Sequence, residues 1–97
     1  MSVLTGNQVQ EIFELAKKKK FALPAVNVIG SSSINATLET AAKLNAPVII
    51  QFSNGGGSFN AGKGLGNIDQ IASVKGSIAG AKHVHELSKE YNATVLL

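Results

Sequence analysis

The sequence predicts an α/β protein in which short parallel strands alternate with helices. Apolar, β-branched runs at residues 23–28, 48–52 and 94–97 have the length and composition of buried strands. Segments with a helical spacing of apolar residues separate these runs, and this alternation is typical of a parallel sheet with right-handed crossovers. The second run passes directly into Ser-Asn-Gly-Gly-Gly. Because ligands bind at the carboxyl ends of parallel strands, this junction predicts a small-molecule site for an oxyanion.

A first helix is expected ahead of these strands, at residues 6–19. Thr5 and Gln8 have the spacing of a capping box, and apolar residues then recur at helical intervals. These residues are Val9, Ile12, Phe13 and Ala16. Four consecutive lysines, residues 17–20, end the helix, where positive charge complements the negative end of the helix dipole.

A second helix is expected between the first two strands. It begins at the polar turn of residues 30–33, which can cap it, and ends near Asn45. Four apolar residues form its buried stripe: Ile34, Leu38, Ala41 and Ala42.

A third helix is expected at about residues 71–91. Its buried stripe is predicted to consist of Ile71, Val74, Ile78 and Ala81. His85 falls on this stripe, so we expect a core histidine there, whereas His83 is expected to face solvent. Since residues two apart on a helix point in nearly opposite directions, the two histidines cannot bind one metal ion.

Residues 53–66 show no helical or alternating period and are rich in glycine, so a long functional loop is expected. Gly55, Gly56 and Gly57 would let backbone N–H groups approach an anion closely, although a flexible linker is the alternative. Lys63 is a candidate counter-charge for a phosphate, with an ordinary exposed lysine as the alternative.

The composition indicates a globular chain of at most one domain. The 97 residues are 44% hydrophobic and 15% charged, and they include no cysteine, which excludes disulfides and thiolate metal sites. No apolar run approaches the roughly 20 residues that span a bilayer, and the N-terminus lacks the features of a secretory signal. We therefore expect a cytoplasmic protein without a membrane partner. The net charge of +3 reflects a solvated helix end, because neither arginine nor interleaved aromatic residues accompany the lysines to indicate a nucleic-acid partner.

Several motifs together resemble a known family. Residues 21–64 and 76–97 are similar to the N-terminal part of class II, metal-dependent fructose-1,6-bisphosphate aldolases. The motifs are PAVN, ETAAK, QFSNGG, AGKG and HVH, in this order. The QFSNGG and AGKG motifs resemble those of the class IIA type, which is typically dimeric. Family members are (β/α)₈ TIM barrels. The resemblance therefore implies that residues 1–97 form the N-terminal portion of a single barrel domain, with its first three parallel strands and intervening helices.

The resemblance implies roles for two residues. Asn27, at the end of the first strand, matches a family asparagine that contacts the substrate. Ser53, at the end of the second strand, matches the family serine that contributes to binding the phosphate of glyceraldehyde 3-phosphate. From the residues alone, each could equally satisfy neighbouring backbone groups.

In the family the third strand runs into a His-Thr-Asp-His segment that carries the acid/base aspartate and the first zinc ligand. Catalytic and metal-binding residues are therefore expected beyond Leu97.

The resemblance further implies an activity. The expected reaction is the reversible, zinc-assisted cleavage of fructose 1,6-bisphosphate to dihydroxyacetone phosphate and glyceraldehyde 3-phosphate in glycolysis and gluconeogenesis. Zinc stabilises the enediolate, a monovalent-cation site is also implied, and the complete protein is expected to be a homodimer. The carboxylates of this chain form no acid/base pair, so the chain alone is expected to bind substrate groups without turning them over. The alternatives are a tagatose-bisphosphate aldolase, a small non-catalytic phosphate-binding α/β module, and a remnant without activity.

The third predicted strand, residues 94–97, ends the sequence. A bare apolar strand at this point would expose its edge, and three strands cannot close a barrel. We therefore expect a chain that is cut short and that aggregates or packs loosely on its own.

Overall fold

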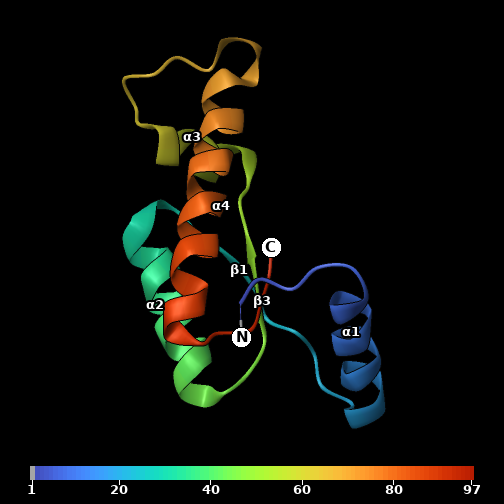
Figure 1. The fold of residues 1–97 in the computed structure, drawn as a ribbon. Coiled ribbons are helices and arrows are strands. Elements are labelled where there is room, and N and C mark those ends of the chain that lie inside the picture. The colour runs from blue at the N-terminus through green and yellow to red at the C-terminus, as the bar shows by residue number, and fades with distance from the viewer. Residues whose placement is uncertain (1) are drawn as a thin grey trace.

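The computed structural model describes residues 2–97, which form three short strands and several helices (Figure 1). In chain order the elements are α1 (Asn7–Lys19), β1 (Ala25–Asn27), α2 (Gly30–Leu44), β2 (Val48–Gln51), α3 (Asn54–Ala61), the 3₁₀ helix η1 (Ile68–Gln70), α4 (Ile71–Tyr91) and β3 (Val95–Leu96). None of the helices in this part of the chain combines the length and the apolar character that crossing a membrane requires.

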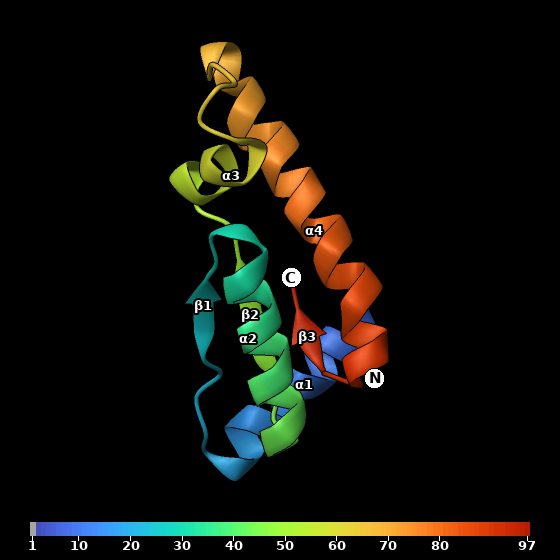
Figure 2. The same cartoon turned by 90° about the vertical axis from the view of Figure 1, so that its left-hand side faces the viewer.

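The three strands form one parallel sheet in the order β1-β2-β3. Asn27 lies opposite Gln51, and Val48 lies opposite Val95. The predicted parallel α/β arrangement is therefore confirmed, and α2 and α4 provide the crossovers. These two helices lie on one side of the strands, while α1 lies on the other (Figures 1 and 2).

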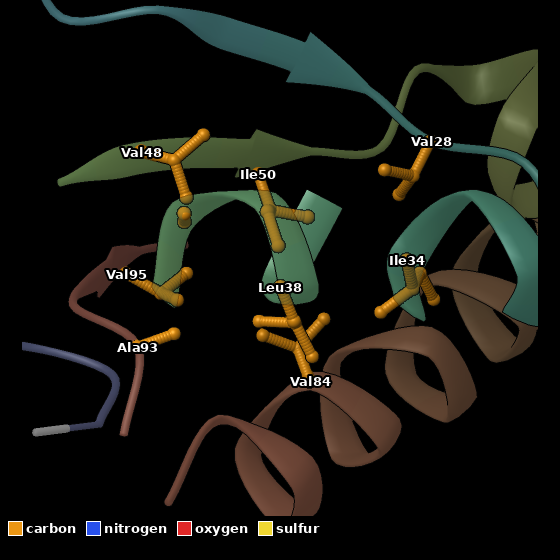
Figure 3. Packing of buried hydrophobic residues seen from close by; sticks show 9 residues of the cluster. Val28, Ile34, Leu38, Val48, Ile50, Val84, Ala93 and Val95 are labelled. Atoms are coloured by element: carbon orange, nitrogen blue, oxygen red, sulfur yellow. The ribbon is translucent and has the colours of Figure 1, made fainter. Parts of the chain in front are cut away.

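The hydrophobic core lies between the sheet and the helices α2 and α4 (Figure 3). Ile50 projects from β2 toward Leu38 of α2 and Val84 of α4, whereas Val48 projects toward Val95 of β3. The predicted stripe of α2 is confirmed, because Ile34, Leu38 and Ala41 are buried and Ala42 packs against the cluster as a partly buried residue.

The predicted stripe of α4 is wrong, although its bounds agree with the expectation. Ile71, Val74 and Ile78 are 42%, 50% and 44% exposed. The residues that α4 buries are mostly small, and they are Ala72, Ser73, Gly76, Gly80, Val84 and Ser88. Small side chains let the helix approach α3 closely, so steric fit rather than hydrophobicity selects the face that packs.

The two histidines of α4 are exchanged relative to the prediction. His85 is exposed rather than buried in the core. His83 is half-buried, and its Nε2 atom lies 2.8 Å from Oδ1 of Asn35 on α2. Since an amide oxygen only accepts, the Nε2 atom donates this hydrogen bond and ties the two crossover helices together.

The segment expected to be one long loop contains the helix α3. Ser53 precedes this helix as its N-cap, and its Oγ atom accepts a hydrogen bond from the N–H of Gly56 at 2.9 Å. The cap satisfies an N–H group that the first turn leaves without a partner. Packing of α3 against α4 then stabilises a glycine-rich helix whose propensity is low. Only residues 62–67 remain as loop before η1.

The edge of β3 is not bare. Val3 forms a parallel bridge with Val95, and the Leu4 N–H donates to the carbonyl of Val95 at 2.8 Å. The expectation of an uncovered third strand is therefore wrong at this edge.

The N-terminal residues then lead into α1, which buries none of its residues. Of the expected capping box, one hydrogen bond is present, from the Thr5 N–H to Oε1 of Gln8 at 3.3 Å.

Candidate functional site

The carboxyl ends of β1 and β2 carry an amide pair. Asn27 ends β1, Gln51 ends β2, and the parallel register places them opposite each other. Nε2 of Gln51 donates to Oδ1 of Asn27 at 2.8 Å. This hydrogen bond fixes the orientation of the Asn27 amide and uses neither hydrogen of its Nδ2 group. Both side chains are exposed, so the amide can meet a ligand above the strand ends.

Ser53 follows the same edge of the sheet, two residues beyond Gln51. Its backbone is extended, with φ −72° and ψ 167°, which turns the chain from β2 into α3. Its Oγ atom accepts from the Gly56 N–H, and its carbonyl accepts from the Gly57 N–H at 2.8 Å. Because Oγ acts as an acceptor in the cap, the hydroxyl hydrogen is available to donate to a bound anion.

The sheet places Asn27 and Ser53 at one edge. The Val28 N–H donates to the carbonyl of Gln51 at 3.1 Å, so the chain leaving β1 stays beside the chain leaving β2. The hairpin of α3 and α4 rises beyond this edge (Figure 1). The structure therefore brings the two predicted site residues to the same end of the sheet, whereas their contact with a substrate stays a prediction.

A hollow of about 340 Å³ opens beside the first turns of α3. Its lining combines an apolar side with polar groups, and the residues are Ile29, Gly55, Ser58, Phe59 and Lys63. Lys63 is exposed and follows the C-terminal end of α3, and it adds a positive charge to the lining of the hollow. Its role as a counter-charge for a phosphate stays a prediction.

The three consecutive glycines act differently from the expectation. Gly56 and Gly57 are buried inside α3 and face protein rather than a ligand. A Cβ on Gly56 would lie 3.0 Å from the carbonyl oxygen of Val28, and one on Gly57 would lie 2.5 Å from that of Ser73. These glycines let α3 pack closely. Gly55 alone has open space around its Cβ position and lines the hollow.

A second hollow, of about 370 Å³, lies between α2 and the sheet, away from Ser53. Pro24, Leu44 and Pro47 are among its lining residues, and its surface is mostly apolar. It offers no charged group for a phosphate, so it is not part of the candidate site.

The described residues do not form the metal site that the resemblance implies for the family. Among residues 2–97, no three His, Cys, Asp or Glu side chains lie where they could hold one ion together. His83 is engaged with Asn35, and His85 lies on the exposed side of the same helix. The described residues therefore show no zinc ligand set.

Two groups of residues near the site were not predicted. Gln51 orients Asn27, and the pairing of two parallel strands that both end in an amide is a signal that could have found it. Asn54 and Ser73 join α3 to α4 through the Ser73 hydroxyl, which donates to the Asn54 carbonyl at 2.9 Å. These two residues lie 19 positions apart across a loop, and no sequence period connects them.

Comparisons with known proteins agree with this geometry. The family model described as fructose-bisphosphate aldolase class-II matches residues 7–97. The class 2 fructose-bisphosphate aldolase of Escherichia coli K12 is 56% identical over 96 residues, which cover 98% of this chain and 27% of that protein. A class 2 relative from Buchnera aphidicola subsp. Schizaphis graminum is 57% identical over 97 residues. The chain thus spans about a quarter of the length of the curated relatives that it matches.

A solved structure shows the same fold. The crystal structure of fructose-bisphosphate aldolase from Campylobacter jejuni matches 97% of this chain and 26% of its own, with a TM-score of 0.88 and 53% sequence identity. The predicted fold class, three parallel strands and intervening helices of an aldolase barrel, is confirmed by this likeness. The family model, the sequence identities and the shared fold lead to one conclusion: this chain belongs to the class II fructose-bisphosphate aldolase family.

Proposed function

We propose that this chain is the N-terminal portion of the barrel of a fructose-bisphosphate aldolase and forms part of its substrate-binding wall. The reaction is the reversible cleavage of fructose 1,6-bisphosphate to dihydroxyacetone phosphate and glyceraldehyde 3-phosphate. One observation carries the proposal: Asn27 and Ser53, which match substrate-binding positions of the family, lie at one carboxyl edge of a parallel sheet. Barrel enzymes assemble their active sites at this edge.

In this proposal Ser53 binds a substrate phosphate. Its oxygen accepts from the Gly56 N–H, which leaves the hydroxyl hydrogen to donate to a phosphate oxygen. The positive end of the α3 dipole adds electrostatic attraction, because Ser53 is the N-cap of this helix. Asn27, held by Gln51, donates from Nδ2 to a hydroxyl or carbonyl oxygen of the sugar.

The complete enzyme is proposed to depend on zinc, to use a monovalent cation, and to act as a homodimer in the cytoplasm. These features rest on the family resemblance. Because residues 2–97 offer no ligand set for the metal, the proposal assigns the zinc ligands and the acid/base carboxylate to residues outside this chain. By itself the chain would bind and orient, without catalysing turnover.

The test uses a chimera, defined as the Escherichia coli aldolase in which residues 2–97 of this chain replace the matching segment. We expect the zinc-loaded chimera to cleave fructose 1,6-bisphosphate with a rate close to that of the parent enzyme. The 97-residue chain with added zinc should show no cleavage. Tagatose 1,6-bisphosphate serves as the competing substrate, for which a lower kcat/KM is expected.

Two results would contradict the proposal. A chimera that folds and binds zinc but has no activity would mean that this segment cannot form the substrate-binding wall. Cleavage by the 97-residue chain alone would mean that the catalytic groups lie within it. The unmodified Escherichia coli enzyme, assayed in parallel, controls for the zinc content and for the substrates.

A further inference from the structure

A polar network joins α4 to α3 at Asn54, the residue that follows Ser53. Its centre is Ser73, a residue of α4 that is only 5% exposed. The Ser73 hydroxyl donates to Asn54, whose backbone oxygen and Oδ1 atom both lie 2.9 Å from it. The same hydroxyl accepts from Nδ2 of Asn67 at 3.0 Å. One hydroxyl therefore uses its single hydrogen toward α3 and its oxygen toward the loop.

The loop end of the network is also fixed. Oδ1 of Asn67 accepts from the backbone N–H of Ser73 at 3.0 Å, which caps the first turn of α4 from outside the helix. Nδ2 of Asn54 donates to Oε1 of Gln70 at 2.7 Å. Asp69 and Gln70 have positive φ values of 55° and 63°, a conformation that is costly for residues with side chains. The hydrogen bonds to Asn54 and Ser73 hold the loop in this strained turn.

The network acts on the residue next to Ser53. Asn54 is the first residue of α3, and Ser73 binds both its backbone and its side chain. The direction of the Ser53 hydroxyl depends on where the first turn of α3 lies, because Oγ accepts from the Gly56 N–H of that turn. A shift of Asn54 away from α4 would rotate the Ser53 hydroxyl relative to the sheet edge.

We infer that Ser73 is a positioning residue, which holds the N-terminus of α3 so that Ser53 meets the phosphate of the aldehyde substrate. The inference rests on the proposed function, since it requires Ser53 to bind that phosphate. Ser73 does not touch the substrate itself. Its effect should therefore be confined to substrates that carry a phosphate at this site and should leave the metal-dependent chemistry unchanged.

The test measures condensation by the zinc-loaded chimera, in which the whole chain is present within a complete aldolase. Dihydroxyacetone phosphate is combined with either glyceraldehyde 3-phosphate or unphosphorylated D-glyceraldehyde. For Ser73→Ala we expect kcat/KM for glyceraldehyde 3-phosphate to fall about fivefold, the scale of one lost hydrogen bond. The kcat/KM for D-glyceraldehyde and the KM for dihydroxyacetone phosphate are expected to stay unchanged. A general loosening of the fold would lower both aldehyde activities together.

Ser88→Ala is the matched control, because Ser88 is also a buried serine of α4 and, among residues 2–97, its hydroxyl donates to the His85 carbonyl of its own helix and to nothing outside that helix. It should change neither aldehyde activity. Asn67→Ala removes both hydrogen bonds of the loop to Ser73 and provides a second variant should Ser73→Ala fold poorly. It should show the same selective loss.

Ser53→Ala separates this inference from the proposed function. If Ser53→Ala loses activity selectively toward glyceraldehyde 3-phosphate while Ser73→Ala and Asn67→Ala lose none, the positioning role is wrong and the phosphate site stands. Equal losses with both aldehydes in the Ser73 and Asn67 variants would also overturn it. If Ser53→Ala itself shows no selectivity, the phosphate role of Ser53 fails and this inference fails with it.

Discussion

Gly57 of α3 and Gly76 of α4 are in backbone contact where the two helices cross. A Cβ atom on Gly76 would overlap the carbonyl oxygen of Gly57 and would lie 2.8 Å from the nitrogen of Ala61. No side chain can move aside at this contact, because the neighbouring atoms belong to the backbone. This contact sets the position of α3 on α4. It thereby also sets the direction of the chain at Ser53, between β2 and α3.

Gly76→Ala should therefore destabilise the protein. Forced overpacking against backbone costs about 1–3 kcal/mol of unfolding free energy, and the better helix propensity of alanine offsets less than this. The measurement is urea unfolding of the chimera. Gly64→Ala is the control, since nothing lies within 4 Å of a Cβ at that loop position. Equal stability of the Gly76 and Gly64 variants would show that the helices do not cross as closely as described.

The two histidines of α4 should differ in their contribution to stability. His83→Ala removes the 2.8 Å hydrogen bond to Asn35 and should lower the free energy of unfolding by about 1 kcal/mol. His85→Ala is the matched change on the exposed side of the helix and should stay within about 0.5 kcal/mol of the parent. The same urea measurement on the chimera checks both variants, and a larger loss for His85 than for His83 would contradict the described orientation of α4.

Tyr91 should give the α2–α4 contact a pH dependence in the alkaline range. Its hydroxyl donates to Oε1 of Glu39 at 3.0 Å, and this hydrogen bond is the main cause that raises the pKa of Tyr91 above 10.0. Because the pKa in the folded state exceeds that in the unfolded state, the stabilisation is complete below about pH 10 and is lost as the pH rises through the raised pKa.

The difference in tyrosinate absorbance between the chimera and its Tyr91→Phe variant reports the titration of Tyr91 alone. The midpoint should move down in Glu39→Gln, because the variant removes the negative charge that disfavours the tyrosinate and weakens the acceptor. An unchanged midpoint in Glu39→Gln would contradict the hydrogen bond.

Local patterns predict much of this fold. The stripe of Ile34, Leu38 and Ala41 defines the buried face of α2 correctly because these apolar residues recur at helical intervals and all three are buried. In α4 several large residues, such as Ile71 and Ile78, are exposed, while Gly76 and Gly80 are buried against α3 and the end of β2. Hydrophobic periodicity fails there because the packing depends on how closely two backbones can approach.

The candidate site, like the fold, was predictable from the sequence only in part. Asn27 and Ser53 could be assigned to one edge in advance, since the carboxyl ends of neighbouring parallel strands share an edge. The helix that Ser53 caps could not be foreseen, because glycine-rich sequences have low helix propensity and α3 depends on packing against α4. The contact between Ser73 and Asn54 depends on that same packing.

Binding of a phosphate by Ser53 is tested most directly by variants that distinguish its two roles, capping of α3 and donation of its hydroxyl hydrogen to the phosphate. Aspartate caps helices as well as serine does, so Ser53→Asp should keep α3 intact while presenting a negative charge to the phosphate. We expect the KM of the chimera for fructose 1,6-bisphosphate to rise at least about tenfold in Ser53→Ala, and further in Ser53→Asp. Ser58→Ala, a change within the helix that Ser53 caps, should change KM far less. A KM for Ser53→Asp equal to that of the parent would show that this serine only caps α3, and that the carboxyl edge of this sheet does not hold the phosphate.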